Sequence, residues 1–556
     1  MKISTAGKWA FTVPFIAMVW AIARVWPVLP AVMQDEYVYS TQSRFIPFAE
    51  QQFPNYIFSW LFSTTSACGD NFYQCAKGYN SVFFFITLVF IYLIAARIVG
   101  HAWAVAVTTV SAVSPIHAYV AYFMPESMYM AFMFATIWVT LNAVRDGHWQ
   151  RWLVAGSMLG LTALVKPHAF FALPAFLLVA LIVSAKEEGH SLKRVALKVV
   201  SFGAAFFAVK FAIGFAFAGP VGLSLFGGYG GLDSVVGQIS SGAEAVNQES
   251  AKSFGQVFFE VTAMQLPSHI SLLLLIAGLP LLLSLRVVFG AFKSKEPMSE
   301  LGSFVVLTGI ISFSFAIVVA AFEGFVSAGG DDHSDRIIMR YYEFIIPLLL
   351  ILGLAFEKYV ASKTLSRVIQ AAVVIAGSTF VLIYFQSNIE SQFADSGLLV
   401  GILQTPGALV TIFIFEVIGA LLWVFKPEIS EKWLGRALLP IMILIMGMFS
   451  QTALMTQVGT QKAFFDVAGQ DARGYLRDVD GKDIVIIGPM RTQVFVAKFW
   501  IDKAYIEDRL IPEKQVIEMD AVPNAKYALL LAGTGVAGEH QVITQGDGYA
   551  LVKLRD

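Results

Sequence analysis

The chain has 556 residues, of which 57% are hydrophobic and only 14% are charged, and its mean hydropathy is +0.69. This leaves too little polar surface for a soluble globular protein and is typical of a chain that crosses a membrane many times. The formal net charge of −1 is uninformative by itself, and we expect no nucleic-acid partner.

Thirteen apolar runs reach or approach the roughly 20 residues that a helix needs to cross a bilayer. In chain order they are 9–33, 81–99, 102–122, 126–143, 152–165, 169–184, 195–218, 270–291, 303–322, 338–356, 368–387, 407–425 and 437–457. The runs 152–165 and 169–184 are short and could form one kinked segment instead, which would reverse the topology of all later segments. With thirteen separate spans, Lys and Arg collect in the loops of one side along the whole chain, as the positive-inside rule requires. We therefore predict thirteen spans.

The first run lacks a small-residue cleavage site and is followed by further spans, so we expect a retained helix with a cytoplasmic N-terminus rather than a signal peptide. No Asn-x-Ser/Thr sequon marks a eukaryotic secretory route. We expect an integral protein of a bacterial inner (plasma) membrane.

Three stretches on the outer side, 34–80, 219–268 and 323–337, are predicted as loops. The first holds the only cysteines, Cys68 and Cys75, and an oxidising compartment favours a disulfide between them over two unpaired thiols. Its aromatic part, 53–62, predicts a helix lying in the interface. The glycine-rich second stretch could close over a ligand or be a plain connector.

Hydropathy falls from about residue 458, and the remainder, 458–556, is predicted to be a small α/β domain on the periplasmic or extracellular side. We expect strands near 483–488, 526–531 and 549–554 and a helix over 491–502. The segment 533–538 resembles a dinucleotide fingerprint only superficially, because no helix pattern follows it.

Acidic residues mark the outer ends of two spans. Asp35 and Glu36 follow the first span, and a carboxylate ionised at neutral pH can take the proton of an attacking hydroxyl. A solvated helix end is the alternative interpretation. Glu126 opens the fourth span behind Pro125, where a negative charge is also favourable on purely structural grounds.

Basic residues lie at the same boundary. Lys166 separates two short runs, and a cation there is either functional or directed to the lipid headgroups. Arg336 and Arg340 are four residues apart and are predicted to share one helical face, an arrangement that suits a phosphate ligand. The nearby segment 329–335 has oxygen and imidazole side chains but no recognised metal spacing, so we interpret it as a solvated loop.

Several short motifs share their order along the chain with a known family. They are Asp35-Glu36 with Tyr39, Pro54 to Trp60, Pro125-Glu126, Lys166-Pro167-His168, and Arg340-Tyr341 to Pro347. In this order and topology the chain resembles the GT-C superfamily of membrane glycosyltransferases, most closely the branch of protein O-mannosyltransferases and the lipid A aminoarabinose transferase. Two departures are Pro54-Asn55 in place of a double proline and a lone Glu126 without an adjacent Asp.

The resemblance implies an all-α membrane domain (1–457) of GT-C type followed by the α/β domain. It implies transfer of a sugar from a polyprenyl-phosphate donor to a hydroxyl of a cell-envelope glycan, lipid or protein acceptor, with inversion, by a monomer in contact with membrane lipids.

The resemblance also implies roles for individual residues. Asp35 would be the base, and Glu36 or Glu126 would orient it or hold a divalent cation, Mg²⁺ or Mn²⁺, although no cofactor is certain. The remaining assignments are Lys166, Arg336, Arg340 and Tyr341 at the donor phosphate, and Tyr39 and His168 with Glu126 on the acceptor side.

Two other classes share some of these features. A polysaccharide polymerase or ligase also has many spans and a large outer loop, but would depend on arginines rather than on the carboxylate pair. A transporter of lipid-linked sugars should show an internal repeat with ionisable groups near mid-membrane. The sequence has no such repeat, and its charges collect at one face.

Overall fold

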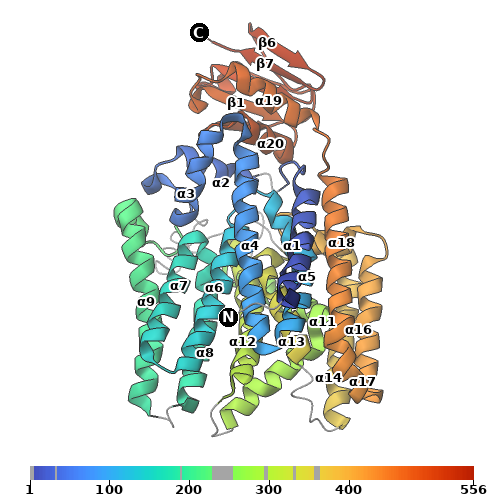
Figure 1. The fold of residues 1–556 in the computed structure, drawn as a ribbon. Helices are drawn as coiled ribbons and strands as arrows, with labels where there is room; N and C mark the ends of the chain where they lie inside the picture. Colours follow the sequence, from blue (N-terminus) through green and yellow to red (C-terminus); the bar gives the residue numbers. More distant parts are fainter. Residues whose placement is uncertain are drawn as a thin grey trace.

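A bundle of long helices carries a small α/β domain at one end in the computed structural model (Figure 1). The structure describes residues 5–31, 34–187, 191–227, 254–293, 298–329, 334–355 and 364–555. Most of the predicted glycine-rich closing segment and the acidic stretch 330–333 therefore lie outside the described residues.

Each of the thirteen predicted runs contains a helix. The helices are α1 (Thr5–Val25), α4 (Phe72–Ile98), α5 (His101–Val113), α6 (Glu126–Asp146), α7 (Trp149–Val165), α8 (Leu173–Glu187), α9 (Leu192–Ala218), α11 (Phe254–Lys293), α12 (Glu300–Ala328), α13 (Ile346–Ala355), α14 (Thr364–Asn388), α16 (Ala408–Phe425) and α18 (Leu439–Gln457). Within the described ranges, nine helical segments are long and apolar enough to cross a membrane, or ten if the bent pair His101–Val113 and Pro115–Ala121 is one span. Others are shorter, with 17 residues in α7 and 10 in α13. The predicted class, a polytopic helical domain with a small α/β domain, is confirmed.

Shorter helices connect or flank these segments. They are α2 (Gln34–Phe45), η1 (Phe48–Glu50), α3 (Tyr56–Phe62), η2 (Ser63–Asn71), η3 (Pro115–Ala121), η4 (Pro167–Ala172), η5 (Gly219–Leu223), η6 (Met339–Tyr341), η7 (Glu343–Ile345), α15 (Gly397–Gln404), α17 (Pro427–Trp433) and the π-helix η9 (Leu434–Leu438). The short runs on either side of Lys166 are separate helices, α7 and α8, joined by η4.

Helices extend into each of the three stretches that are predicted as outer loops. Stretch 34–80 is largely helical, α11 already begins at Phe254, and α12 continues to Ala328. Hydropathy missed these extensions because they contain polar side chains that are buried and hydrogen-bonded, such as Gln265 and Glu323.

The C-terminal domain is built on a five-stranded sheet with the order β2-β1-β4-β7-β6. These strands are β1 (Ile484–Gly488), β2 (Glu507–Leu510), β4 (Tyr527–Leu531), β6 (Gln541–Gly546) and β7 (Tyr549–Lys553), with a second small sheet of β3 (Val516–Ile517) and β5 (Gly535–Val536). The pairs β1–β2 and β1–β4 are parallel, and β4–β7 and β6–β7 are antiparallel. The helices are α19 (Phe464–Tyr475), α20 (Arg491–Ile501), η10 (Gly481–Asp483) and η11 (Met519–Ala521).

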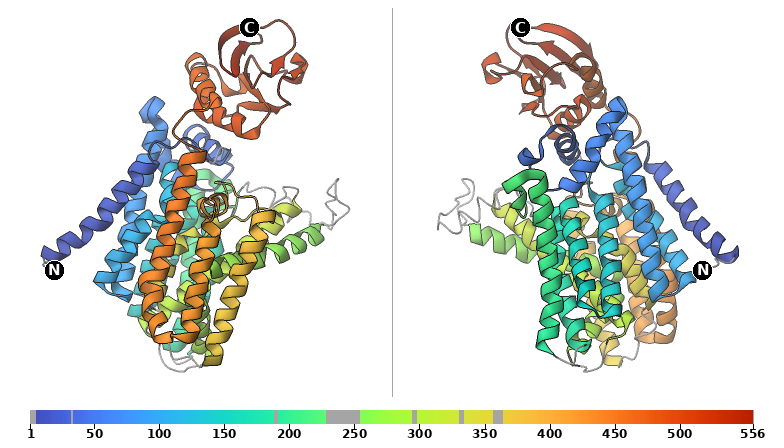
Figure 2. Two further views of the ribbon diagram at one scale, coloured as in Figure 1. Left: turned by 90° about the vertical axis from the view of Figure 1, so that its right-hand side faces the viewer. Right: turned by 60° about the vertical axis from the view of Figure 1, so that its left-hand side comes forward.

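The domain packs directly on the bundle. Val496, Phe499 and Trp500 of α20 belong to the same apolar core as the membrane helices. The helices α2 and α3 lie between the bundle and the domain (Figure 1), whereas α1 leans away from the other helices toward its N-terminal end (Figure 2). The candidate residues Asp35 and Glu36 are therefore on the element sandwiched between the two parts.

Candidate active site

Asp35 lies in the first turn of α2 and faces a basic side chain from the other half of the bundle. Arg340, in η6, donates from Nη1 to Asp35 Oδ2 over 2.8 Å. The Asp35 side chain is 35% exposed, whereas that of Arg340 is only 9% exposed. A partly accessible carboxylate beside a buried cation is thus the first feature of the site.

A second ion pair adjoins the first. Lys166 Nζ donates to Glu126 Oε1 over 2.6 Å, and both side chains are at most 3% exposed. Arg340 Nε lies 3.6 Å from the same Glu126 oxygen, so Arg340 connects Asp35 to Glu126. Glu126 starts α6 behind Pro125, and Lys166 occupies the extended turn between α7 and η4. Four of the predicted charged residues are therefore brought together from four segments.

Aromatic rings line this group of charges. The rings of His168 and Tyr341 are 3.8 Å apart, and Lys166 Nζ lies 5.0 Å from the centre of the Tyr341 ring. Tyr39 is 4% exposed and packs on Phe53 and Phe58. The predicted residues Tyr39, His168 and Tyr341 thus belong to the walls of the site.

Glu36 contacts backbone amides rather than the charged side chains around Asp35. Its two oxygens accept hydrogen bonds from backbone amides, Oε2 from Ala31 at 2.7 Å and Oε1 from Phe123 at 2.9 Å, and the side chain is fully buried. Glu36 therefore ties the segment before Asp35 to the segment before Glu126.

The contacts of Glu36 and Glu126 do not suit the binding of a divalent cation by these two side chains. The Glu36 oxygens are held by N–H groups, and Glu126 is surrounded by Lys166 and Arg340, which would repel a second cation. In the part of the chain that is described, no three His, Cys, Asp or Glu side chains gather as metal ligands would.

The predicted pairing of Arg336 with Arg340 on one helical face is wrong. Residues 336–338 are not helical, because the tenth run begins only with the 3-10 helix η6 at Met339. Arg336 instead forms a two-point ion pair with Asp395, at 2.9 Å from Nε and 2.6 Å from Nη2. Asp395 also receives the backbone N–H of Arg340 on its carbonyl oxygen at 2.8 Å. Arg336 therefore supports the segment that carries Arg340.

A buried network holds the same segment from α11 and α12. The backbone N–H of Ile338 donates to Glu323 Oε1 over 2.7 Å, and Glu323 Oε2 lies 2.9 Å from His269 Nε2. His269 Nδ1 lies 2.6 Å from the hydroxyl of Tyr342. The sequence analysis missed His269 and Glu323, although ionisable residues beside apolar runs are themselves a signal for function.

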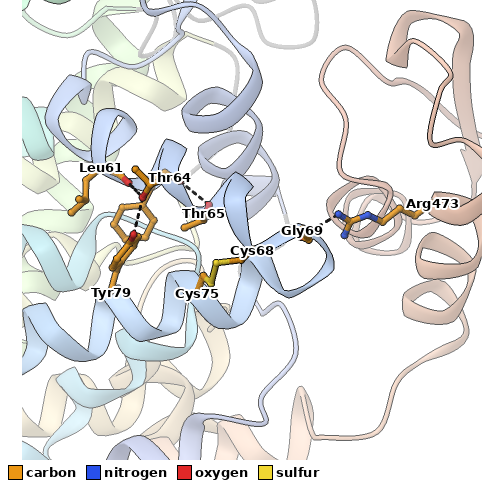
Figure 3. The surroundings of a disulfide bond; sticks show 9 residues. Leu61, Thr64, Thr65, Cys68, Gly69, Cys75, Tyr79 and Arg473 are labelled. Atoms are coloured by element: carbon orange, nitrogen blue, oxygen red, sulfur yellow. Dashed lines mark hydrogen bonds between the residues drawn. A yellow bond between two sulfur atoms is a disulfide. The ribbon is translucent and has the colours of Figure 1, made fainter.

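The predicted disulfide is present. Cys68 and Cys75 are bonded, with their Cα atoms 6.6 Å apart, and close a loop at the start of α4 (Figure 3). Arg473 of the C-terminal domain reaches this loop and donates to the Gly69 carbonyl over 3.4 Å.

Comparisons with known proteins bear on the fold and on part of the site. Residues 58–213 match the model of the family described as dolichyl-phosphate-mannose-protein mannosyltransferase. This region is less than half of the chain but contains Glu126, Lys166 and His168. The match confirms the resemblance that the motifs indicated and supports the class of membrane glycosyltransferases. No curated protein matches the chain.

Solved structures give fold likenesses at low identity. ArnT from Cupriavidus metallidurans in the apo state is 15% identical, with 99% of this chain and 98% of that chain covered and a TM-score of 0.47. The oligosaccharyltransferase AglB from Archaeoglobus fulgidus, in complex with an inhibitory peptide and a dolichol-phosphate, is 12% identical, with 95% and 70% covered and a TM-score of 0.46.

Proposed function

We propose that the protein is an inverting membrane glycosyltransferase, which moves a sugar from a polyprenyl-phosphate donor to a hydroxyl group of a cell-envelope acceptor. The observation that carries the proposal is the placement of one partly exposed carboxylate, Asp35, against the buried cations Arg340 and Lys166. The family match over residues 58–213 supports the donor class, because the description of the family names dolichyl-phosphate-mannose.

Asp35 is the proposed general base. As the acceptor oxygen bonds to the anomeric carbon, its proton passes to the Asp35 carboxylate. The bond between the anomeric carbon and the phosphate oxygen breaks at the same time, and the phosphate leaves with the electron pair. A single displacement of this kind inverts the anomeric centre.

Arg340 and Lys166 are proposed to stabilise the departing phosphate. Both are held in place before the donor arrives, Lys166 by Glu126 and Arg340 by Asp35, Glu126 and the backbone contact to Asp395. Preorganised cations of this kind are the largest electrostatic contribution to many transferase reactions. Tyr341 and His168 form an apolar wall beside them.

The proposed orientation places the site and the C-terminal domain on the periplasmic or extracellular side of a bacterial inner membrane. The distribution of Lys and Arg in the sequence and the disulfide both support this orientation. We propose that the enzyme works as a monomer.

The decisive experiment is sugar transfer by purified protein in liposomes, with a panel of radiolabelled polyprenyl-phosphate sugars and membrane acceptors. Asp35→Asn should abolish transfer, whereas Asp483→Asn, which loses a partly exposed ion pair with Lys526 in the C-terminal domain, should leave it near normal. Turnover by Asp35→Asn close to that of the unmodified protein would sink the assignment.

A further inference from the structure

The helix that carries Asp35 is clamped at its other end by the C-terminal domain. Asp35 lies in the first turn of the 12-residue α2, and Arg44 lies in its last turn. Arg44 Nη1 donates to Asp502 Oδ2 over 3.0 Å, and Asp502 directly follows α20. The side chains of Arg44 and Asp502 are 1% and 7% exposed, so this is a buried contact between the two parts of the protein.

Asp502 holds a second arginine as well. Arg473 of α19 donates from Nη2 to Asp502 Oδ2 over 3.0 Å. The same guanidinium lies 3.3 Å from Asp70 and reaches the Gly69 carbonyl, both within the loop closed by the disulfide (Figure 3). One carboxylate therefore joins α2 to α19 and, through Arg473, to the disulfide loop.

Aromatic contacts extend this interface along α2. The Tyr37 hydroxyl donates to the Lys503 carbonyl over 3.1 Å, and the Tyr37 ring lies 6.0 Å from that of Phe495. The Arg44 guanidinium stacks over Phe72 at 3.9 Å. Both ends of α2 are thus packed, one against the site and one against the domain.

A helix of this length does not fix its own position. Isolated helices shorter than about 12–15 residues are marginal in water, and their stability comes from packing. The contacts of Glu36 with the backbone of Ala31 and Phe123 hold the first turn of α2 and not its far end. The position of Asp35 therefore depends on what α2 packs against.

We propose that Asp502 is a positioning residue, through which the C-terminal domain fixes α2 and so sets Asp35 against Arg340. This inference rests on the proposed function of Asp35 as base. It gives the C-terminal domain a role in the reaction, because the domain fixes the helix that carries Asp35.

The electrostatics of the cluster support this role. Burial lowers the pKa of Arg44, and Asp502 opposes that shift while Arg473 adds to it. Without the carboxylate, two largely buried arginines would face each other, and the interface should open. Removing one partner from such a buried group of charges is strongly unfavourable.

The test is Asp502→Asn, studied in the full-length protein. Asp502 has a φ of 64°, a left-handed conformation that Asn tolerates well, so this variant removes the charge without straining the backbone. We expect faster amide hydrogen exchange in residues 34–45 and unchanged exchange in β1 and β4. We also expect kcat to fall about tenfold or more at an unchanged KM for the donor, since small misplacements of a reacting group cost ~10²-fold.

Matched variants make each outcome decisive. Asp483→Asn should leave both exchange and kcat unchanged, because its ion pair with Lys526 is far more exposed. If Asp502→Asn loosens the domain itself, Arg44→Lys decides, since it alters the same contact from the bundle side and should slow transfer while β1 and β4 stay protected. Unchanged exchange in α2 together with unchanged kcat in these variants would overturn the inference. Faster exchange in α2 of a protein that transfers none of the tested sugars would instead count against the proposed function.

Discussion

Arg340 and Asp35, separated by 305 positions in the sequence, form a 2.8 Å ion pair at the centre of the site. The proposed base is therefore engaged by one of the cations proposed to bind the donor phosphate. A phosphate that takes hydrogen bonds from Arg340 must compete with Asp35 for them. We expect donor binding to release Asp35 for the acceptor hydroxyl, which favours an order in which the donor binds first.

This competition predicts how Asp35→Asn changes donor affinity. An amide cannot form the ion pair, so Arg340 no longer has to leave the Asp35 carboxylate before it binds phosphate. The Asn variant should bind a short-chain polyprenyl phosphate at least as tightly as the unmodified protein, although it transfers no sugar. Isothermal titration of both proteins measures the difference, and weaker binding by the variant would contradict the competition.

Arg340→Lys tests whether catalysis needs the simultaneous contact of Arg340 with Asp35 and Glu126, and not only its positive charge. Lysine offers a single ammonium and cannot contact Asp35 and Glu126 in the way a planar guanidinium does. We expect kcat to fall by ~10²-fold or more, in line with the loss of a preorganised donor group.

Arg336→Lys is the matched control for that prediction. Arg336 pairs with Asp395 rather than with Asp35 or Glu126, and its side chain is 23% exposed. A lysine there keeps the charge but cannot contact both Asp395 oxygens as the guanidinium does, so kcat should fall, but less than in Arg340→Lys. An equal loss in the two variants would indicate that Arg336, like Arg340, acts on the donor phosphate.

Glu36→Gln should act through position rather than through chemistry. Both Glu36 oxygens accept from backbone N–H groups, and an amide in their place would direct an NH₂ group at one of them. We expect a loss of about 1–3 kcal/mol in the free energy of unfolding, the cost of an unsatisfied buried group, together with a lower kcat.

Thermal unfolding of Glu36→Gln and of Glu50→Gln separates the loss of buried hydrogen bonds from a general effect of losing a carboxylate. Glu50 also accepts a hydrogen bond, from Tyr505 at 3.1 Å, but in an exposed setting. Its variant should match the unmodified protein in Tm. Equal stability of Glu36→Gln would show that the buried contacts are not needed.

The sequence predicted the four charged residues at the centre of the site better than the contacts that hold them in place. Asp35, Glu126, Lys166 and Arg340 are visible because each stands at the boundary of an apolar run, where a charge is conspicuous. The pairing of Arg336 with Arg340 was wrong because it assumed a helix before Met339. Helix ends depend on tertiary contacts, here with Asp395, that hydropathy does not register.

The same limit applies to the fold. Helices in the thirteen apolar runs and the strands β1, β4 and β7 follow from the length and hydropathy of the apolar runs. The strands β2 and β6 were missed, since both are at the edges of the sheet and have few buried residues. The packing of α20 on α2 could not be foreseen, because it joins residues more than 400 positions apart.

The Glu126 and Lys166 pair allows structural and functional roles to be separated in one cycle of variants. Breaking such a buried pair from one side leaves an uncompensated charge and costs ~3–5 kcal/mol, whereas replacing both partners is far less harmful. Lys166→Met and Glu126→Gln should each lower the unfolding midpoint markedly, and the double variant should recover much of the loss. Transfer should nevertheless stay absent in the double variant, because its phosphate-binding cation is gone. If activity returned together with stability, Lys166 would serve only to neutralise Glu126, and Arg340 alone would have to stabilise the departing phosphate.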